Sequence, residues 1–357
     1  MSVRARAVGA GVGAVLFGGV ILAQGAGPAV AAAGAAGVKS PEKFTIEDPR
    51  ITESSGLAAS RAHKNIYWTH NDSDDGPYVY AVDGRTGKTV ATVTLRGIDP
   101  RDVEAVSVGP DGDVYVGDIG DNLDGTWPEV WIYRFPEPEK LRDTTVTPTR
   151  YTVRYEGGPR NAESLMVHPK TGRVYIASKS SKGKGGLYAG PRKLTASGVN
   201  TFRRIAGVDF EATDGAFSPD GTRLVLRAYF SATAYRWKSG GDGGIERLGS
   251  VPVPLQRQGE SVTFAPDGRT VLFGSEGRAS EVEPVELSGS ALPSSAREGD
   301  GGGGDGSAGS DGSDDKGGRG AGEGEDGHSN LLLAGATFAG AVVVWAALRR
   351  GVRRGRG

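Results

Sequence analysis

The 357-residue sequence lacks cysteine altogether, so it can form neither disulfide bonds nor cysteine-ligated metal sites. It also lacks an excess of either charge, because 42 Lys and Arg stand against 43 Asp and Glu. A net charge of −1 gives no electrostatic reason to expect nucleic-acid binding. Only four histidines are present, which leaves few candidates for histidine-based metal binding or acid–base catalysis. The pattern of a long amphipathic helix is absent from the central part of the chain.

Two segments lack charge entirely, and the first lies near the N-terminus. Arg4 and Arg6 precede an uncharged apolar run over residues 7–22, and small residues follow at Ala29–Ala33. This order of a basic region, an apolar region and A-x-A residues is typical of an export signal peptide. We therefore expect residues 1–33 to be a signal peptide, with an uncleaved N-terminal anchor as the alternative.

The second uncharged segment covers residues 331–348. As a helix it would be about 27 Å long, close to the thickness of a bilayer core of about 30 Å. Residues 349–357 are rich in arginine. The positive-inside rule places them in the cytoplasm and the chain before the apolar segment outside. No LPxTG-like motif precedes the segment, so a retained transmembrane helix is expected rather than covalent attachment to a cell wall.

Residues 293–330 form a segment rich in Gly, Asp and Ser before the apolar run. From Glu298 to Asp326 nine acidic residues stand against Lys316 and Arg319, and aromatic residues are absent. Such a composition cannot bury a core, so we expect a disordered acidic linker that holds an outer domain away from the membrane. The acidic residues are irregularly spaced and do not match a calcium-binding repeat.

The chain between residues 41 and 292 contains a repeated motif of strand, turn and strand. Its turns are Pro110-Asp-Gly, Pro169-Lys-Thr-Gly, Pro219-Asp-Gly and Pro266-Asp-Gly, and a degenerate first copy begins at Ser55. Proline presets φ early in each turn and glycine takes a positive φ, so each copy predicts a hairpin. The copies begin about 46 to 60 residues apart, a period typical of four-stranded propeller blades.

The repeats predict an all-β fold, a β-propeller of five blades, although six shorter blades would also fill the length. The last copy lacks an obvious fourth strand before the linker begins. A strand without a blade lies at Lys43–Glu47, near the start of the repeat region. We expect it to pair with the last copy, which would close the ring and remove exposed sheet edges.

The turn motifs Ser218-Pro-Asp-Gly-Thr-Arg-Leu and Ala265-Pro-Asp-Gly-Arg-Thr-Val resemble the PDG repeats of WD40-like and Tol-type periplasmic β-propellers. Together with Trp68-Thr-His-Asn-Asp72 and Tyr115-Val-Gly-Asp-Ile-Gly-Asp-Asn122, they also resemble a group of secreted propellers from high-GC Gram-positive bacteria. The resemblance covers roughly 250 residues and implies the fold. It implies little about activity, because propellers host many functions. The Trp-Asp dipeptide that ends true WD40 blades is missing.

Acidic residues open the inner strand of most copies, and these strands line the axis of a propeller. Carboxylate and amide oxygens suit a hard cation such as Ca²⁺. The predicted cation site consists of Glu104, Glu163, Glu260, Asp121 and Asn122. Loops expected at the same mouth also supply His70, Asp72, Lys179, Arg227 and Glu276, with His70 as a candidate general base. Alternatively, the acids accept backbone N–H groups from the neighbouring blade, and Thr213 rather than Asp214 aligns with the glutamates.

No GxSxG or HExxH motif is present, and the GKT at Gly87–Thr89 has Val82 where a P-loop needs glycine. Because no nucleophile–base pair emerges, the sequence favours a membrane-tethered recognition module outside the cell. Its partner would be an unidentified extracellular protein, peptide or glycan. The alternative is a Ca²⁺-assisted hydrolase, similar in arrangement to lactonase or phosphotriesterase propellers, with its site at the channel mouth.

Overall fold

The computed structural model describes residues 40–72, 75–122, 125–180 and 185–300. The predicted signal peptide, the predicted transmembrane helix, the arginine-rich tail and nearly all of the predicted linker lie outside these ranges. Within them, no helix has both the length and the apolar character needed to cross a bilayer.

The described residues form antiparallel strand groups in the order of the sequence repeats. The first group contains β2 (Ser54–Ala59), β3 (Ile66–Asn71), β4 (Tyr78–Asp83) and β5 (Thr89–Leu95). The second contains β6 (Val103–Val108), β7 (Asp113–Asp118), β8 (Val130–Pro136) and β10 (Thr149–Tyr155). The third contains β11 (Ala162–Val167), β12 (Val174–Ser178), β13 (Gly185–Ala189) and β14 (Val199–Val208).

The remaining two groups follow the same order. One contains β15 (Asp214–Phe217), β16 (Arg223–Ala228), β17 (Ser231–Lys238) and β18 (Gly244–Val251). The other contains β19 (Gly259–Phe264), β20 (Thr270–Ser275), β21 (Glu281–Glu286) and, at its edge, β1 (Phe44–Thr45).

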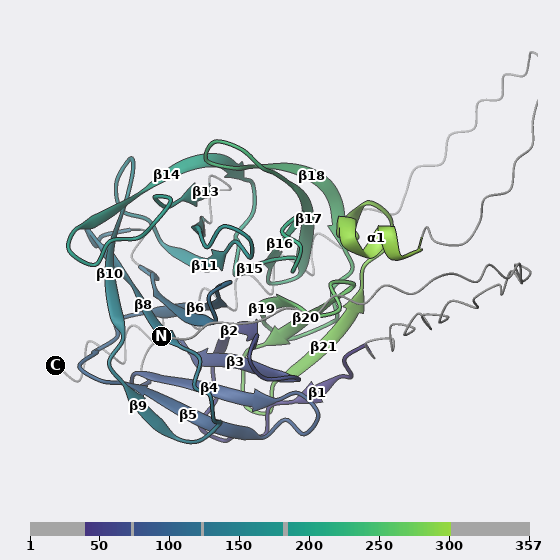
Figure 1. Ribbon diagram of the computed structural model, residues 1–357, viewed down its shortest axis with the longest axis horizontal. Coiled ribbons are helices and arrows are strands. Elements are labelled where there is room, and N and C mark those ends of the chain that lie inside the picture. Colours follow the sequence, from purple (N-terminus) through teal and green to yellow (C-terminus); the bar gives the residue numbers. More distant parts are fainter. Residues whose placement is uncertain (1–39, 73–74, 123–124, 181–184, 301–357) are drawn as a thin grey trace, which may run out of the picture. The chain divides into compact units, whose positions relative to one another are not determined.

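The first strand of each group lies innermost, and these strands contact one another in the cycle β2, β6, β11, β15, β19 and back to β2 (Figure 1). They all run in the same direction along the axis. Near their starts, Thr213 donates to the carbonyl of Gly259, 3.3 Å away. Near their ends, the backbone N–H of Ala59 donates to Thr263 Oγ1 at 3.3 Å. The chain therefore has a propeller-type fold, with the starts of the inner strands at one end of the axis.

The strand β1 supplies the missing edge of the last group, as the sequence predicts. Phe44 pairs with Val282 in an antiparallel ladder with β21. The Phe44 ring stacks on Tyr67 of the first group at 5.5 Å between centroids. These contacts join the last group to the first through one apolar cluster, to which Ile46 and Leu57 also belong.

The glycine of each PDG-type turn has the positive φ that the motif predicts: Gly112, Gly172, Gly221 and Gly268. Three of these glycines also lie against the proline of the preceding repeat. A Cβ at Gly221 would lie 3.4 Å from Pro169 Cγ, for example, and one at Gly268 would lie 3.8 Å from Pro219 Cδ. The turns therefore pack on one another around the end of the axis where the inner strands finish.

The outer strands pair in a way that the sequence does not predict. β10 runs parallel to β14, with Thr152 opposite Val199, so the second and third groups form one eight-stranded sheet. A short strand, β9 (Thr144–Val146), pairs parallel with β5 of the first group. The Asn200 side chain reinforces the first of these pairings by donating to the carbonyl of Thr152 at 3.0 Å.

The chain continues beyond the expected end of the propeller as η1 (Gly289–Ala291) and α1 (Ser294–Asp300). This differs from the expectation that residue 293 begins a disordered linker. Ser295 donates to Asp220 through its backbone and its hydroxyl, at 3.0 and 3.1 Å, and Arg269 donates to the carbonyl of Ala296 at 2.7 Å. Polar contacts that sequence periodicity does not reveal therefore hold this segment on the fourth and fifth groups.

Candidate functional site

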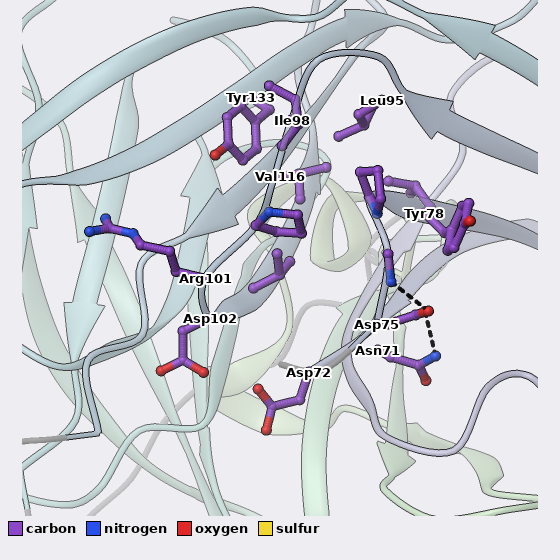
Figure 2. Close-up of a pocket in the computed structure, with 15 residues that line it drawn as sticks. Asn71, Asp72, Asp75, Tyr78, Leu95, Ile98, Arg101, Asp102, Val116 and Tyr133 are labelled. Atoms are coloured by element: carbon purple, nitrogen blue, oxygen red, sulfur yellow. Dashed lines mark hydrogen bonds between the residues drawn. The ribbon is translucent and has the colours of Figure 1, made fainter. Parts of the chain in front are cut away.

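Three carboxylates meet at the end of the axis where the inner strands begin. Asp102 precedes β6, Glu104 lies on it, and Asp72 follows β3. One carboxylate oxygen of each lies within 4.8 Å of the others. Figure 2 shows Asp72 and Asp102 beside each other at the edge of a small pocket. The sequence-predicted residue Glu104 thus belongs to a compact acidic trio.

Several contacts fix the position of Asp102. The Asp118 carboxylate accepts the backbone N–H of Asp102 at 2.9 Å, and it also accepts the hydroxyl of Tyr133 at 2.9 Å. The preceding Arg101 guanidinium lies 4.0 and 3.6 Å from the ring centroids of Trp127 and Trp131, an arrangement suited to cation–π attraction. The segment that carries Asp102 is therefore held on both sides.

The predicted ligand Asn122 contacts the trio through a hydrogen bond to one of its carboxylates. Its Nδ2 donates to Asp102 Oδ2 at 3.2 Å, and its Oδ1 accepts from Asn161 Nδ2 at 3.4 Å. This amide orients a carboxylate of the trio, as the outer-shell groups of metal sites do.

The trio carries more negative charge than the buried site tolerates. Burial raises the pKa of Asp102 to about 8, with the charges of Asp72 and Glu163 acting in the same direction. Burial also raises the pKa of Glu104 well above its usual range, and again Asp72 and Glu163 contribute. Like charges in a low-dielectric site need either protons or a cation between them.

A second polar cluster adjoins the trio around Lys179. Its ammonium donates to Glu163 Oε1 at 2.6 Å and to the hydroxyl of Tyr229 at 2.5 Å. Burial alone would lower the pKa of Lys179, but Glu163, Tyr229 and Glu260 raise it well above its usual value. Lys179 is therefore a fixed positive charge and not a neutral amine available for nucleophilic attack.

Glu260 and Glu276 complete the acidic surroundings. Burial raises the pKa of Glu260 to about 8, although Lys179 acts against it, and Gln258 donates to its carboxylate at 2.9 Å. Burial and the charge of Glu260 raise the pKa of Glu276 to about 8. Each of these groups interacts with Asp72 and Glu163, so the predicted residues Glu104, Glu163 and Glu260 share one electrostatic environment.

Other predicted residues have structural partners. Asp121 accepts backbone N–H groups of Thr126 and Trp127 and so closes its own loop. Asp214 accepts the backbone N–H of Val262 in the neighbouring group at 2.8 Å, the role that the alternative hypothesis gave to such acids. Arg227 donates to the carbonyls of Ser261 and Gly274 at 2.8 and 3.0 Å.

His70 is held within the fold. Its Nδ1 lies 2.9 Å from the carbonyl oxygen of Asn71, and burial lowers its pKa, so the neutral imidazole is favoured. Its Nε2 faces Gly56, where an added Cβ would lie only 2.6 Å away. The structure therefore favours a packing and hydrogen-bonding role for this histidine.

Sequence reasoning missed Asp102 and Tyr229 as members of the site. Asp102 could have been found, because residues two apart in an extended strand face the same side and Glu104 was already a candidate. Tyr229 lies in the turn after β16, where no sequence pattern predicts the position of a side-chain hydroxyl.

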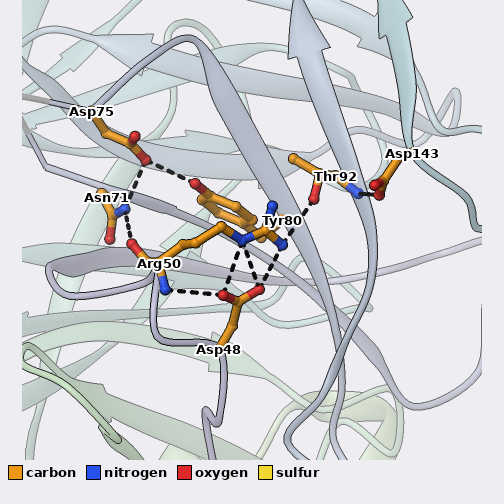
Figure 3. A network of polar contacts seen from close by, with 7 residues as sticks. All are labelled: Asp48, Arg50, Asn71, Asp75, Tyr80, Thr92 and Asp143. Carbon is orange, nitrogen blue, oxygen red and sulfur yellow. Dashed lines mark hydrogen bonds and ion pairs between the residues drawn. The ribbon is translucent and has the colours of Figure 1, made fainter.

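A wider polar pocket of about 600 Å³ adjoins the small pocket beside the trio, and Asp75 and Tyr78 line both. Figure 3 shows a polar network that includes several of the residues lining this wider pocket. Arg50 is held by Asp48 at 2.7 Å and lies 3.3 Å from Thr92 Oγ1, while Tyr80 donates to Asp75 at 3.0 Å. Side chains with polar groups thus line this pocket, and hydrogen bonds join several of them.

The residues of the trio fit a hard divalent cation. Three carboxylates supply up to six oxygen ligands without any softer donor, which suits Ca²⁺ better than metals that prefer nitrogen or sulfur. The raised pKa values of Asp102 and Glu104 give an independent reason for positive charge there, since a cation would replace the protons that these carboxyls otherwise keep.

No protein-family model and no curated protein sequence matches the chain. Solved structures resemble it in fold. A gluconolactonase from Xanthomonas campestris is 14% identical, with a TM-score of 0.40 over 69% of this chain and 89% of that one. U3-55K is 13% identical, with a TM-score of 0.37 over 66% and 68%. A hydrazine synthase from Kuenenia stuttgartiensis is 12% identical, with a TM-score of 0.37 over 62% and 61%.

Proposed function

We propose that the chain is a divalent-cation-dependent hydrolase of small esters, of the lactone or phosphotriester kind, with its site at the mouth of the propeller axis. The observation that carries this proposal is the acidic trio, in which Asp72, Asp102 and Glu104 bring carboxylate oxygens within 4.8 Å of one another. The recognition module that the sequence favours has no comparable support from the trio.

The chemistry follows from the groups beside the trio. A bound divalent cation lowers the pKa of a water ligand and polarises an ester oxygen. Hydrolysis adds the hydroxyl of water to the acyl carbon or phosphorus and returns a proton to the leaving oxygen. In this proposal Lys179 and the Tyr229 hydroxyl donate hydrogen bonds to the anionic oxygen of the substrate, and Glu163 holds the Lys179 ammonium in place.

The test combines cation binding with activity of the full chain. Thermal melting is measured in chelator and after addition of Ca²⁺, Mn²⁺ or Zn²⁺, and hydrolysis is assayed on lactones, aryl esters and aryl phosphotriesters. We expect a cation to raise Tm and to support hydrolysis, with both effects lost in Asp102→Asn and Glu104→Gln. The matched control is Glu246→Gln, because Glu246 forms an exposed ion pair with Arg236 away from the trio.

Two results would contradict the proposal in different ways. An unchanged Tm with every cation, together with no metal by elemental analysis, would remove the cation site. A cation that raises Tm without hydrolysis of any substrate would keep the site and remove the enzyme activity.

A recognition module is the second candidate function, and the wide polar pocket favours it. Arg50, Tyr78 and Asp143 line this pocket, and the side chain of Tyr78 is exposed. A preorganised polar wall with an accessible aromatic ring suits an extended protein, peptide or glycan partner. Retention of one such ligand without its conversion, and its loss in Tyr78→Ala, would support this function over hydrolysis.

We also propose that the propeller has five blades and is exported, held at the outer face of a membrane by residues 331–348. The cycle of five inner strands supports the blade number. The uncharged segments and the terminal arginines support the topology. Protease added to intact, wall-stripped cells should release the propeller, and a fully protected propeller would contradict the topology.

A further inference from the structure

A separate cavity of about 600 Å³ lies at the other end of the axis, where the inner strands finish. Apolar residues of all five inner strands line it, among them Leu57, Val106, Val167, Phe217 and Phe264. The acidic trio lies at the starts of these strands, so the two sites are at opposite ends of the ring. The volume is within the range of pockets that bind small organic molecules.

The charge of this cavity is opposite to that of the trio. None of its described lining residues is acidic, whereas Arg61, His63 and Lys64 all line it. Arg61 and Lys64 are exposed, and within the described ranges neither forms an ion pair. An apolar cavity beside two cations without ionic partners suits a molecule with an apolar body and an anionic end.

The loop that carries these cations is fixed rather than loose. Glu137 accepts the backbone N–H groups of Arg61 and Ala62 at 3.1 and 3.0 Å, and it also accepts Trp68 Nε1 at 2.6 Å. His63 Nε2 lies 2.7 Å from the carbonyl oxygen of Pro138. A loop held in this way keeps the backbone of Arg61 and Lys64 beside the cavity, so binding a ligand has to order only their side chains.

We propose that this cavity binds a free fatty acid, with the acyl chain against the ends of the inner strands and the carboxylate near Arg61 and Lys64. The site is a concave hollow lined by residues of five strands, which suits one inserted chain better than the flat surface of a bilayer. This inference does not depend on the proposed hydrolase, because none of the residues of the trio lines the cavity.

The test uses the full chain in polymer-bounded discs, with empty discs as the blank, so that no free detergent competes. A dansyl-labelled fatty acid is the probe, and its fluorescence should rise to saturation at one molecule per chain. An unlabelled fatty acid should displace it much better than the fatty alcohol of the same length. In Arg61→Gln/Lys64→Gln, binding of the acid should weaken about five- to tenfold, with the alcohol unaffected.

The control variant is Arg96→Gln, which removes an exposed cation that does not line the cavity. Ala62→Trp tests the location independently, because Ala62 lines the cavity but is exposed, so the larger side chain can enter the cavity without replacing a core residue. Equal binding to empty discs, no preference for acid over alcohol, or full binding by folded Ala62→Trp would each overturn the proposal.

Discussion

The protonation states of single carboxyl groups determine whether the acidic end of the ring can bind a cation. The pKa of Asp102 is about 8, chiefly because the group is buried and secondarily because Asp72 and Glu163 are negative. At neutral pH Asp102 therefore keeps its proton while no cation is bound. A divalent cation favours the ionised form, so binding and deprotonation are linked.

Cation binding at pH 7 should accordingly release protons, and the number released should fall as the pH rises past about 8. Calorimetric titration of the cation in buffers of different ionisation enthalpy measures this number. Asp102→Asn should show neither binding heat nor proton release, because it removes a ligand, whereas the control Glu246→Gln should release as many protons as the parent. Proton release that stays constant between pH 6 and pH 9 would argue against a cation at Asp102.

Asp220 shows the opposite behaviour at an acidic residue in a turn. Burial acts to raise its pKa, but hydrogen bonds from Ser218, Thr222 and the backbone of Ser295 outweigh burial and lower the pKa to about 2. A carboxyl whose folded pKa lies below its unfolded pKa stabilises the fold above about pH 4. That contribution is lost as the pH falls toward 2.

We expect Asp220→Asn to reduce the free energy of unfolding at pH 7 by about 1 kcal/mol, allowing for solvent screening at this partly exposed site. The difference from the parent should shrink as the pH falls from 4 to 2. Urea unfolding over this pH range provides the measurement. Asp209→Asn, at an exposed ion pair with Arg247, is the control and should show little of this pH dependence.

Residue types alone could identify only part of the site. Glu104 was predictable because its place in the repeat puts it at the start of an inner strand. Asp121 and Asp214 also carry carboxylates, yet theirs accept hydrogen bonds from backbone N–H groups. Which oxygen meets an N–H group depends on loop geometry over a few ångströms, and sequence spacing does not contain that information.

At the scale of elements, two glycines of the PDG-type turns share a positive φ but differ in their surroundings. Gly112 and Gly221 have φ values of +80° and +73°, which strain any residue with a side chain. A Cβ at Gly112 would meet nothing within 4 Å, whereas one at Gly221 would lie 2.9 Å from the His168 ring. The two positions therefore separate backbone strain from steric contact.

Gly112→Ala should cost about 1 kcal/mol of stability, the usual price of placing alanine in a left-handed conformation. Gly221→Ala should cost more, about 2–3 kcal/mol, because the His168 ring must also move. Chemical denaturation of both variants gives the comparison. Equal costs would show that the His168 ring yields freely.

The hairpins were predictable because proline and glycine at fixed places dictate a local turn. The parallel pairs β10–β14 and β5–β9 were not, since they join outer strands of different repeats and leave no local signature. The helix α1 escaped prediction for a similar reason, because its stabilising contacts come from distant turns.

The whole ring depends on the contact between its first and last groups. Phe44 is buried, and its ring stacks on Tyr67 while its backbone pairs with Val282. Phe44→Ala should lower the free energy of unfolding by about 3–4 kcal/mol, and thermal melting should show it. Lys43→Ala, which removes only exposed ion pairs with Glu281 and Glu283, is the control and should have a much smaller effect.

If the two variants melt alike, closure through β1 contributes little to the stability of the ring. A lower Tm accompanied by association of chains would instead indicate that the freed edge of β21 pairs between molecules.

The pairing of β1 with β21 also determines the order in which the protein can fold. The partners lie at opposite ends of the described chain, so the last sheet cannot be completed while the polypeptide is still emerging from a ribosome or a translocation channel. Contacts this remote in sequence form slowly, since the entropy of closing a long loop is lost before they stabilise anything. Until β21 emerges, β1 lacks its partner and β20 has an open edge, and this interval is when the nascent chain most needs protection from aggregation.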